Sequence, residues 1–533
     1  MGAKFSTTKQ KSVYFEHQLI NYKTTAASLS PECLFEIFEY LDRNSLYFCL
    51  LVNRSWCKVV APLLWRAPFR TSIGPSLEPA KLIRTYLSCL GERSKLYLIN
   101  NGVRLPPLVS VIFDYPSFLR ELKFVDLYNA VSDWFANEFG NNEDEQQSVF
   151  LRILIAEQLF KLFMNRCPTF EMLSLSDLSH EAPMPLVPLL AGADPCLTRL
   201  KAFQCVNKHN GKKDIFRAMS QVSETLETLW IGGVEHEMEV KALGVLIRSQ
   251  RRLKTFKYSW DNQTRLQIVL DETLGALRTQ AKSLTTIHFE YCNFSHCESL
   301  EPLAACVNLE NMRFIQCIFL EERLHPLTNA PFPNLKNLEF HCSFVDSSRY
   351  WIDTRDIASI IRNSSGSLEK LVLPKVGNSE ELSLELIKSL RFGKSIREIR
   401  LQIRNEETND FMDFFNNNNR LEKLIFICHG DLNVEDLLTQ MNQRWPDTLS
   451  SLQIKGQWII TSEYLKAFLK DSNSCLKHLE LHSSNHLTDD HVNVVLDYLK
   501  EMKATKKSSL SSVFMSGDRI TEKRGNFCLT PLI

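Results

Sequence analysis

Apolar residues return at a regular interval through the C-terminal two thirds of the chain. From about residue 167 the sequence repeats the pattern L-x-x-L-x-L, with other apolar residues allowed at the L positions, as in LETLWI from residue 226 and LKHLEL from residue 476. We call the second apolar position of each unit the ruler position. It falls at Leu173, Leu200, Leu229, Phe256, Ile287, Met312, Leu338, Leu371, Ile399, Leu424, Leu452, Leu479 and Val513. Successive ruler positions lie 25 to 34 residues apart, which predicts one repeated structural unit.

Each unit combines the signals of a strand and a helix. The last two apolar positions alternate with one other residue, which is the period of a strand. Between these segments apolar residues recur three and four positions apart, as in DIASIIRN from residue 356 and DDHVNVVLDYLKEM from residue 489. Repeated strand and helix units predict an α/β solenoid, with parallel strands on the concave face and helices on the convex face. An irregular α/β domain with unrelated apolar triplets is the alternative.

Cysteines follow several of the strand segments. LTTIHFEYCNF contains Cys292 and LENMRFIQCIF contains Cys317; Cys205 stands at the same offset from its ruler residue, and Cys342 and Cys428 fall one residue short. The units resemble cysteine-containing leucine-rich repeats over about 360 residues. This resemblance implies that the cysteines occupy a buried turn position, where they satisfy backbone groups.

One group of residues could be taken for a metal site, namely His288, Cys292, His296 and Cys297. The repeat already uses Cys292, and the spacing matches no common zinc module. We therefore predict neither a metal nor another cofactor.

A second pattern lies near the N-terminus, where the sequence reads LSPECLFEIFEYL from residue 29. Ser30 can cap a helix, Pro31 suits its first turn, and Glu32 favours the positive end of the helix dipole. One apolar face follows, formed by Leu34, Ile37, Phe38 and Leu41. Residues 42–45 should end this helix and offer a new cap at Asn44 or Ser45. Two more short helices are expected, one over 46–51 and one from Asn53 to LLW at 63–65.

So small a bundle rarely buries its apolar surface without a partner. The segment from Leu29 to Trp65 resembles an F-box, with Ser30 where that family often has its first proline. The resemblance implies docking on a Skp-type adaptor through Leu29, Pro31, Glu32, Leu34, Ile37, Phe38 and Leu41. It also implies a core of Leu46, Val52, Trp56, Leu64 and Trp65. The alternative is a capped amphipathic helix that only covers the end of the solenoid.

We expect four regions along the chain. They are a flexible leader at 1–28, the F-box at 29–66, a helical linker and N-terminal cap at 67–166, and the repeats with a C-terminal cap at 167–533. The linker contains one possible irregular repeat, LRELKF from residue 119. At the N-terminus Gly2 and Ser6 match a myristoylation pattern, and nearby lysines could supply a second membrane signal. A disordered leader is the alternative, so membrane contact is expected only if Gly2 is acylated.

Composition narrows the possible partners. Lysine plus arginine (62) equals aspartate plus glutamate (62), so no global charge favours nucleic acid. The 15 cysteines include no C-x-x-C pair, which favours free thiols and a cytoplasmic or nuclear location. The sequence contains no run of 18 apolar residues, which a membrane span would need. It also contains none of the catalytic motifs that would predict an enzyme.

The residue after each ruler position should point outward and form a row across the concave face. Read in order, this row is Ser174, Lys201, Trp230, Lys257, His288, Arg313, Glu339, Val372, Arg400, Ile425, Gln453 and Glu480. Lys201, Trp230, Lys257, His288, Arg313 and Arg400 are the candidate substrate-binding residues, suited to an acidic or phosphorylated peptide. An ordinary mixed surface is the alternative.

The two resemblances together imply the substrate-recognition subunit of a Skp, cullin and F-box ubiquitin ligase. Its expected partners are a Skp-type adaptor, through it a cullin, and a protein substrate. The alternative function is a leucine-rich-repeat scaffold or interaction protein outside any ligase, which acylation of Gly2 would tether to a membrane.

Overall fold

The computed structural model describes most of the 533 residues in two compact units. The described residues are 29–69, 79–107, 110–140, 145–176, 193–206, 211–234, 236–260, 270–318, 320, 323–341, 354–364, 366–373, 380–404, 407–471, 475–482, 486–505, 510–517, 520 and 527–529. Unit 1 is Met1–Gln204 and unit 2 is Cys205–Ile533. The expected leader at 1–28, with Gly2, lies outside the described residues. In the described part of the chain no helix has both the length and the apolar character needed to cross a bilayer.

Unit 1 begins with a bundle of three short helices, which we call the N-terminal bundle. They are α2 (Pro31–Phe38), α3 (Arg43–Cys49) and α4 (Arg54–Leu64). Ser30 caps α2 as predicted, and Asn53 caps α4 through its side-chain oxygen. The prediction of Asn44 or Ser45 as the second cap is wrong. Asp42 is the cap, because its carboxylate accepts hydrogen bonds from the backbone N–H groups of those two residues, at 2.9 and 3.0 Å.

The rest of unit 1 is mainly helical. Its elements are α5 (Pro79–Ser88), α6 (Glu92–Asn100), the 3₁₀ helix η1 (Tyr115–Phe118), β1 (Glu121–Lys123), α7 (Phe124–Phe139), α8 (Glu145–Arg166), β2 (Met172–Ser176) and α9 (Ala193–Leu197). Strand β3 (Ala202–Val206) spans the division between the units. Strands β1 and β2 pair in parallel with Leu122 opposite Leu173. The irregular repeat expected from residue 119 is therefore a strand in ruler register.

Unit 2 alternates helices and strands along its whole length. Its helices are α10 (Lys212–Val222), α11 (Glu237–Ser249), α12 (Asp271–Arg278), α13 (Glu301–Ala304), η4 (His325–Asn329), α14 (Thr354–Asn363), α15 (Glu380–Ser389), η6 (Leu390–Phe392), α16 (Thr408–Asn417), α17 (Val434–Asn442), α18 (Ser462–Asp471) and α19 (Asp489–Thr505). Its strands are β4 (Thr228–Gly232), β5 (Thr255–Ser259), β6 (Thr286–Glu290), β7 (Asn311–Ile315), β8 (Asn337–His341), β9 (Lys370–Val372), β10 (Glu398–Ile403), β11 (Lys423–Asn433), β12 (Ser451–Ile459), β13 (His478–His482), β14 (Ser512–Ser516) and β15 (Phe527–Leu529).

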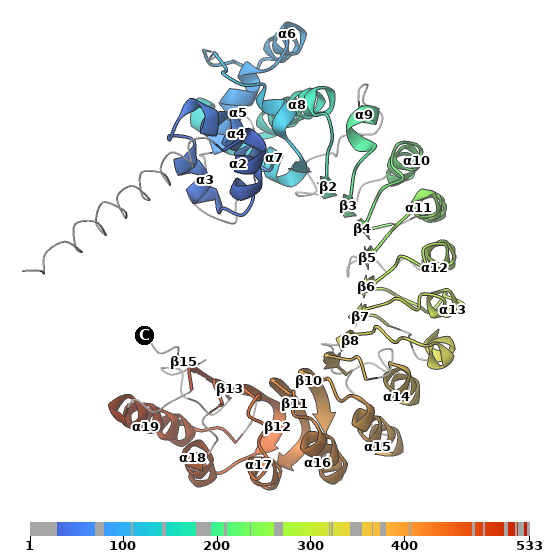
Figure 1. Cartoon of the computed structure of the whole chain (residues 1–533), viewed down its shortest axis with the longest axis vertical. Helices are drawn as coiled ribbons and strands as arrows, with labels where there is room; N and C mark the ends of the chain where they lie inside the picture. The colour runs from blue at the N-terminus through green and yellow to red at the C-terminus, as the bar shows by residue number, and fades with distance from the viewer. Residues whose placement is uncertain are drawn as a thin grey trace, which may run out of the picture. The chain divides into compact units, whose positions relative to one another are not determined.

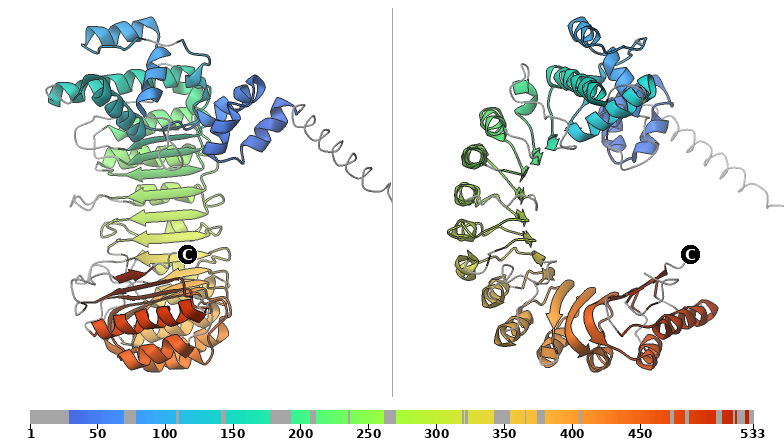
Figure 2. Two further views of the ribbon diagram at one scale, coloured as in Figure 1. Left: turned by 90° about the vertical axis from the view of Figure 1, so that its left-hand side faces the viewer. Right: turned by 180° about the vertical axis from the view of Figure 1, so that it is seen from behind.

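The strands of unit 2 form a curved parallel sheet with the helices on its outer side (Figures 1 and 2). Each strand from β4 to β14 pairs in parallel with the next, and β15 pairs antiparallel with β14. The ruler residues from Leu229 to Val513 stand directly opposite one another across every one of these parallel pairs. The predicted leucine-rich-repeat solenoid, with parallel strands and covering helices, is confirmed.

The core of unit 2 lies between the sheet and the helices. The ruler residues from Leu229 to Val513 are at most 1% exposed, and so are most of the residues two positions further on. Aromatic rings continue from strand to strand in this second row, where Phe314 stacks on Phe289 at 5.8 Å and on Phe340 at 5.4 Å between ring centroids. Burying one such side chain contributes about 1.5–3 kcal/mol, so the repeated rows hold the solenoid together.

The prediction of Leu200 as a ruler residue is wrong. The N–H groups of Lys201 and Ala202 both donate to the carbonyl of Glu171, the same pattern that brings a strand to its start at Thr255. Strand β3 therefore begins at Ala202, and Phe203 is its ruler residue instead of Leu200. Cys205 consequently lies inside the strand, two residues after the ruler position, and not at the predicted turn.

The other predicted turn cysteines that can be described behave as expected in two repeats. The thiol of Cys292 lies 3.4 Å from the carbonyl oxygen of Glu290 and 3.8 Å from that of Tyr258. Cys317 makes the equivalent contacts with its own strand and the preceding one, at 3.5 and 3.4 Å. Both are buried, so each thiol satisfies carbonyl groups where the chain leaves the strand. Cys428 instead lies within β11, and Cys342 lies outside the described residues.

Two glycines of unit 2 should respond in opposite ways to substitution by alanine. Gly456 has a φ of +96°, and a Cβ there would lie 2.2 Å from the carbonyl oxygen of Cys428 on β11. We expect Gly456→Ala to lower the free energy of unfolding by about 2 kcal/mol or more. Gly275 lies within α12 with nothing within 4 Å of its Cβ position, so Gly275→Ala should raise it by about 0.5–1 kcal/mol. Urea unfolding midpoints measure both, and equal shifts of the same sign would contradict this account.

Candidate protein-interaction surfaces

The N-terminal bundle has a small core of its own. Its buried members are Leu34, Phe38, Leu46, Val59, Val60 and Leu64. The ring of Trp56 meets that of Phe38 edge to face at 4.9 Å between centroids. Each helix is only 7 to 11 residues long and contributes one narrow apolar stripe to this core. Many large apolar side chains of the bundle therefore lie outside this core.

Large apolar side chains are exposed on the bundle in unusual number. They are Leu29, Phe35, Ile37, Tyr40, Tyr47, Phe48, Leu51 and Val52, with exposed fractions from 36% to 88%. These are eight of the nineteen exposed large apolar side chains in the described part of the chain, and all lie within 24 residues. A concentration of this kind is typical of protein-interaction surfaces, because monomeric proteins rarely leave it in water. We call these eight residues the bundle surface.

The third helix connects the bundle to the helices that follow it in unit 1. Trp65, directly after α4, lies 4.1 Å from Tyr115 and 5.3 Å from Tyr86 between ring centroids. Arg43 donates from its guanidinium to the carbonyl oxygens of Ala67 and Pro68, at 3.1 and 3.3 Å. Aromatic packing and these charge-assisted hydrogen bonds fix the bundle against its neighbour.

The second candidate surface is the concave face of unit 2. Strand pairing places Trp230, Lys257, His288 and Arg313 directly beside one another on β4 to β7. We call these four residues the β4–β7 row. All four are half-buried. The ammonium group of Lys257 lies over the indole ring of Trp230, 5.2 Å from its centroid, which is a cation–π contact.

His288 is neutral at physiological pH in this setting. Burial, followed by the positive charges of Arg313 and Lys257, lowers the pKa of His288 from 6.5 to about 4. Glu339 acts in the opposite direction but does not compensate. The Nε2 atom of His288 is buried, and no hydrogen-bond partner for it lies among the described residues.

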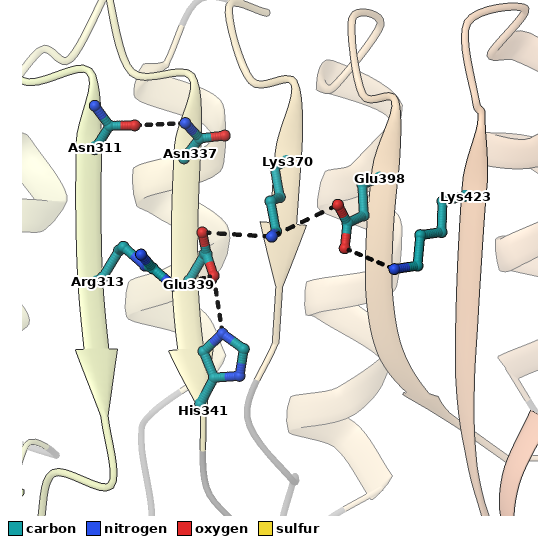
Figure 3. Close-up of polar contacts among 8 residues, drawn as sticks. All are labelled: Asn311, Arg313, Asn337, Glu339, His341, Lys370, Glu398 and Lys423. Carbon is teal, nitrogen blue, oxygen red and sulfur yellow. Dashed lines mark hydrogen bonds and ion pairs between the residues drawn. The ribbon is translucent and has the colours of Figure 1, made fainter. Parts of the chain in front are cut away.

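Charges on the next strands of the concave face are matched to one another (Figure 3). Glu339 is buried on β8 and lies 2.8 Å from His341, 3.4 Å from Arg313 and 3.7 Å from Lys370. Lys370 continues to Glu398 at 3.5 Å. Burial alone raises the pKa of Glu339, but the His341 hydrogen bond and the two cations outweigh it and lower the pKa.

This ladder of alternating charges ends on β11, where Lys423 lies 3.7 Å from Glu398. The row of Lys370, Glu398 and Lys423 continues on the preceding strands with uncharged polar residues, where Asn337 donates to Asn311 and Asn311 donates to Thr286. We call the four residues Glu339, Lys370, Glu398 and Lys423 the charge ladder.

Two of the six predicted substrate-binding residues lie apart from the β4–β7 row. Lys201 precedes β3 by one residue, so Gln204 occupies its predicted place. The row to which Lys201 belongs runs along the start of the strands, where neighbours form structural ion pairs such as Glu227 with Lys254 at 2.8 Å. Arg400 does face the concave side on β10, but Glu339 and Val372 separate it from Arg313 in the row.

Metal-ligating side chains do not gather in the described ranges, where no group of three or more His, Cys, Asp or Glu could hold an ion. The thiol of Cys297 lies 3.3 Å from the carboxylate of Asp271, whereas that of Cys292 faces backbone carbonyls. Burial raises the pKa of Cys297 to about 12, with Asp271 acting in the same direction, so this thiol stays protonated.

The comparisons with known proteins concern mainly the bundle. Residues 29–71 match the family model described as F-box-like. Residues 29–71 are an F-box-like domain. No curated protein matches the chain in sequence.

Two solved structures resemble larger parts of the chain. One is the complex of Rad7 and Elc1 from yeast, with 14% identity over 61% of this chain and 78% of that chain, at a TM-score of 0.38. The other is the leucine-rich repeat-containing protein LegL7 from Legionella pneumophila, with 11% identity over 57% of this chain and 91% of that chain, at a TM-score of 0.30.

Within the F-box-like domain the predicted docking residues divide into two sets. Leu29, Pro31, Glu32 and Ile37 are exposed, and Leu41 packs partly against the core. Leu34 and Phe38 have a packing role in this structure, and their contact with a partner stays a prediction. They are 3% and 2% exposed and hold the three helices together.

The predicted core residues of the F-box-like domain divide in the same way. Leu46 and Leu64 are buried, and Trp56 and Trp65 pack against the core from its edge. Val52 is 56% exposed and belongs to the bundle surface, so its assignment to the core is wrong.

Sequence reasoning missed most of the bundle surface, namely Phe35, Tyr40, Tyr47, Phe48 and Leu51. A signal was present, because these residues are large and apolar but out of phase with the stripe that forms the core. Residues of this kind on a short helix have no place in its own core, which makes them candidates for contact with a partner.

The neutral state of His288 can be measured directly. NMR titration of histidine-labelled chain, with His288→Gln to assign the signal, should give a pKa near 4. Lys257→Gln or Arg313→Gln should raise it towards the ordinary value, because each removes a neighbouring positive charge; Glu339 and His341 are the other titratable neighbours. Between pH 6.5 and 4 the unfolded chain takes up a proton that the folded chain refuses, so His288 lowers stability as pH falls through that window. A pKa at or above 6.5 contradicts the described surroundings.

Proposed function

We propose that this protein is the substrate-recognition subunit of a Skp, cullin and F-box type ubiquitin ligase. The F-box-like domain docks on a Skp-type adaptor, which joins the chain to a cullin. The solenoid of unit 2 holds the protein substrate. A cytoplasmic or nuclear location, expected from the cysteine content, belongs to the same proposal.

The observation that carries this proposal is the bundle surface. Its eight exposed apolar side chains lie inside residues 29–71, the segment that matches the F-box-like family. Burying a single side chain of this size contributes about 1.5–3 kcal/mol, so several together are enough for a specific complex. Ile37 on α2 and Phe48 on α3 are the best anchors, since they are 49% and 67% exposed and lie outside the core.

The solenoid supports the second half of the proposal. Its parallel strands display side chains in straight rows, so a substrate segment crossing the face meets one residue of each strand. With the adaptor at one domain and the substrate at another, the chain raises the effective concentration of substrate lysines near a charged ubiquitin carrier. In this proposal the protein contributes proximity and needs no catalytic residue of its own.

Capture of a purified Skp-type adaptor by the full chain tests the proposal. Ile37→Asp and Phe48→Asp should each weaken capture at least tenfold, because a buried unpaired carboxylate replaces an apolar contact. Biolayer interferometry gives the affinities, and circular dichroism checks that the fold is kept. Leu34 is unsuitable for this test, since its loss would unfold the domain.

Val245→Asp is the matched control. Val245 is 48% exposed on α11 of unit 2, so the same chemical change occurs away from the F-box-like domain and capture should be unchanged. If the unmodified chain does not capture the adaptor, the ligase proposal fails and the scaffold interpretation replaces it. If it captures the adaptor and Ile37→Asp does so equally well, the bundle surface is not the docking site.

A further inference from the structure

The β4–β7 row carries positive charge that the described structure leaves unmatched. Lys257 has no carboxylate within 4 Å among the described residues, and its ammonium group lies over the Trp230 ring. Within the described ranges Arg313 has one ion pair, to Glu339 at 3.4 Å, and Glu339 also pairs with His341 and Lys370. Among the described residues, Lys257 and Arg313 together therefore have one carboxylate within 4 Å, that of Glu339, and it also pairs with His341 and Lys370.

Hydrogen-bonding capacity is left over at the same place. The Nε of Arg313 and the Nε2 of His288 are both buried, and neither has a hydrogen-bond partner among the described residues. Buried polar atoms in folded proteins are nearly always paired, and exceptions gather where a ligand completes the site. These two atoms lie on adjacent strands, because His288 stands directly opposite Arg313.

Acidic side chains in the surroundings do not remove this excess. Glu290 lies on the same face of β6, two residues after His288, and no cation lies within 4 Å of its carboxylate in the described ranges. The charge ladder on β8 to β11 offers a contrast on the same sheet. There Glu339, Lys370, Glu398 and Lys423 alternate in sign, and each lies within 4 Å of a charge of opposite sign (Figure 3).

The spacing suits a single group of negative charge. Neighbouring strands lie about 4.8 Å apart, so the backbones at Lys257 and Arg313 are separated by about 10 Å with His288 between them. Long side chains from both flanking strands can converge on one ligand held above the middle strand. Arginine and lysine bind such groups through charge-assisted hydrogen bonds, and a neutral imidazole can donate a third.

We propose that the β4–β7 row is a subsite for an oxyanion group of the protein substrate, either a carboxylate or a phosphoryl group. Lys257 and Arg313 supply the charge, and His288 donates a hydrogen bond from Nε2. Trp230 holds Lys257 in position and offers an apolar contact to the neighbouring substrate residue. The charge ladder takes no part in this recognition, since its charges satisfy one another. The inference rests on the proposed function insofar as the ligand belongs to a substrate.

Peptide libraries of fixed central residue test the subsite. Nine-residue peptides carry aspartate, phosphoserine or asparagine at the centre, with alanine, serine, leucine and phenylalanine randomised at the flanking positions. The aspartate and phosphoserine libraries should each retain about five times as much of the full chain as the asparagine library, or more. Lys257→Gln and Arg313→Gln should each reduce this retention to the asparagine level. Phosphoserine well above aspartate identifies a phosphoryl ligand, and equal retention identifies any carboxylate or phosphate of suitable placement.

Lys423→Gln is the matched control for bulk attraction. It removes the same charge from the ladder on the same face, and Glu398 keeps Lys370 as a partner. Retention by this variant should equal that of the unmodified chain. Soluble aspartate library should also raise the pKa of His288, a change that a purely structural histidine would not show. Retention of the chain on neither the aspartate nor the phosphoserine library above the asparagine level, or an equal loss in Lys423→Gln and Lys257→Gln, overturns the proposal.

Failure of this inference can be told apart from failure of the proposed function. Adaptor capture is measured on the same variants, and none of them changes the bundle surface. Adaptor capture without selectivity for acidic peptides leaves the ligase proposal intact and removes the subsite. Selectivity for acidic peptides without adaptor capture leaves the subsite in a protein of another class.

Discussion

The structure of the repeat region depends on the burial of one side chain per strand in register with its neighbours. Side chains alternate between the two faces of a strand, so burying the ruler residue decides which residues face the concave side. From Leu229 to Val513 the ruler residues are opposite one another and at most 1% exposed. A slip of one residue in β6 would bury His288 and expose Ile287. The rows of side chains on the concave face are therefore a consequence of packing on the opposite face of the same sheet.

This constraint explains why the fold could be predicted from the sequence and where the prediction stopped. The ruler pattern is strong because it reports burial, which every repeat needs. It failed at LTRLKAFQC, which fits L-x-x-L-x-L in two overlapping frames, one with Leu200 at the ruler position and one with Phe203. Both frames give spacings within the range of the other repeats. Only the backbone hydrogen bonds to the carbonyl of Glu171 distinguish them, and these depend on where the preceding segment lies.

The F-box-like domain illustrates a different limit. Periodicity identified the apolar stripe of α2 correctly, but a stripe does not state what covers it. In a bundle of three short helices the stripe is used for the domain's own core, as Leu34 and Phe38 show. The exposed apolar surface consists mainly of residues out of phase with it, such as Phe35 and Phe48, together with Ile37 at the edge of the stripe. Phase relative to the core therefore separates packing residues from contact residues better than apolar character alone.

Burial also controls how charge is distributed across the concave face. A carboxylate as buried as that of Glu339 is costly unless cations and hydrogen-bond donors surround it, and Arg313, Lys370 and His341 do so. Each partner recruited in this way is less available to a ligand, and the requirement propagates through Lys370 to Glu398 and Lys423. The β4–β7 row contains no buried carboxylate, so nothing on β5 or β6 neutralises Lys257. A chain of zero formal net charge thus keeps a local positive site on β4 to β7, because the charges on β8 to β11 pair with one another.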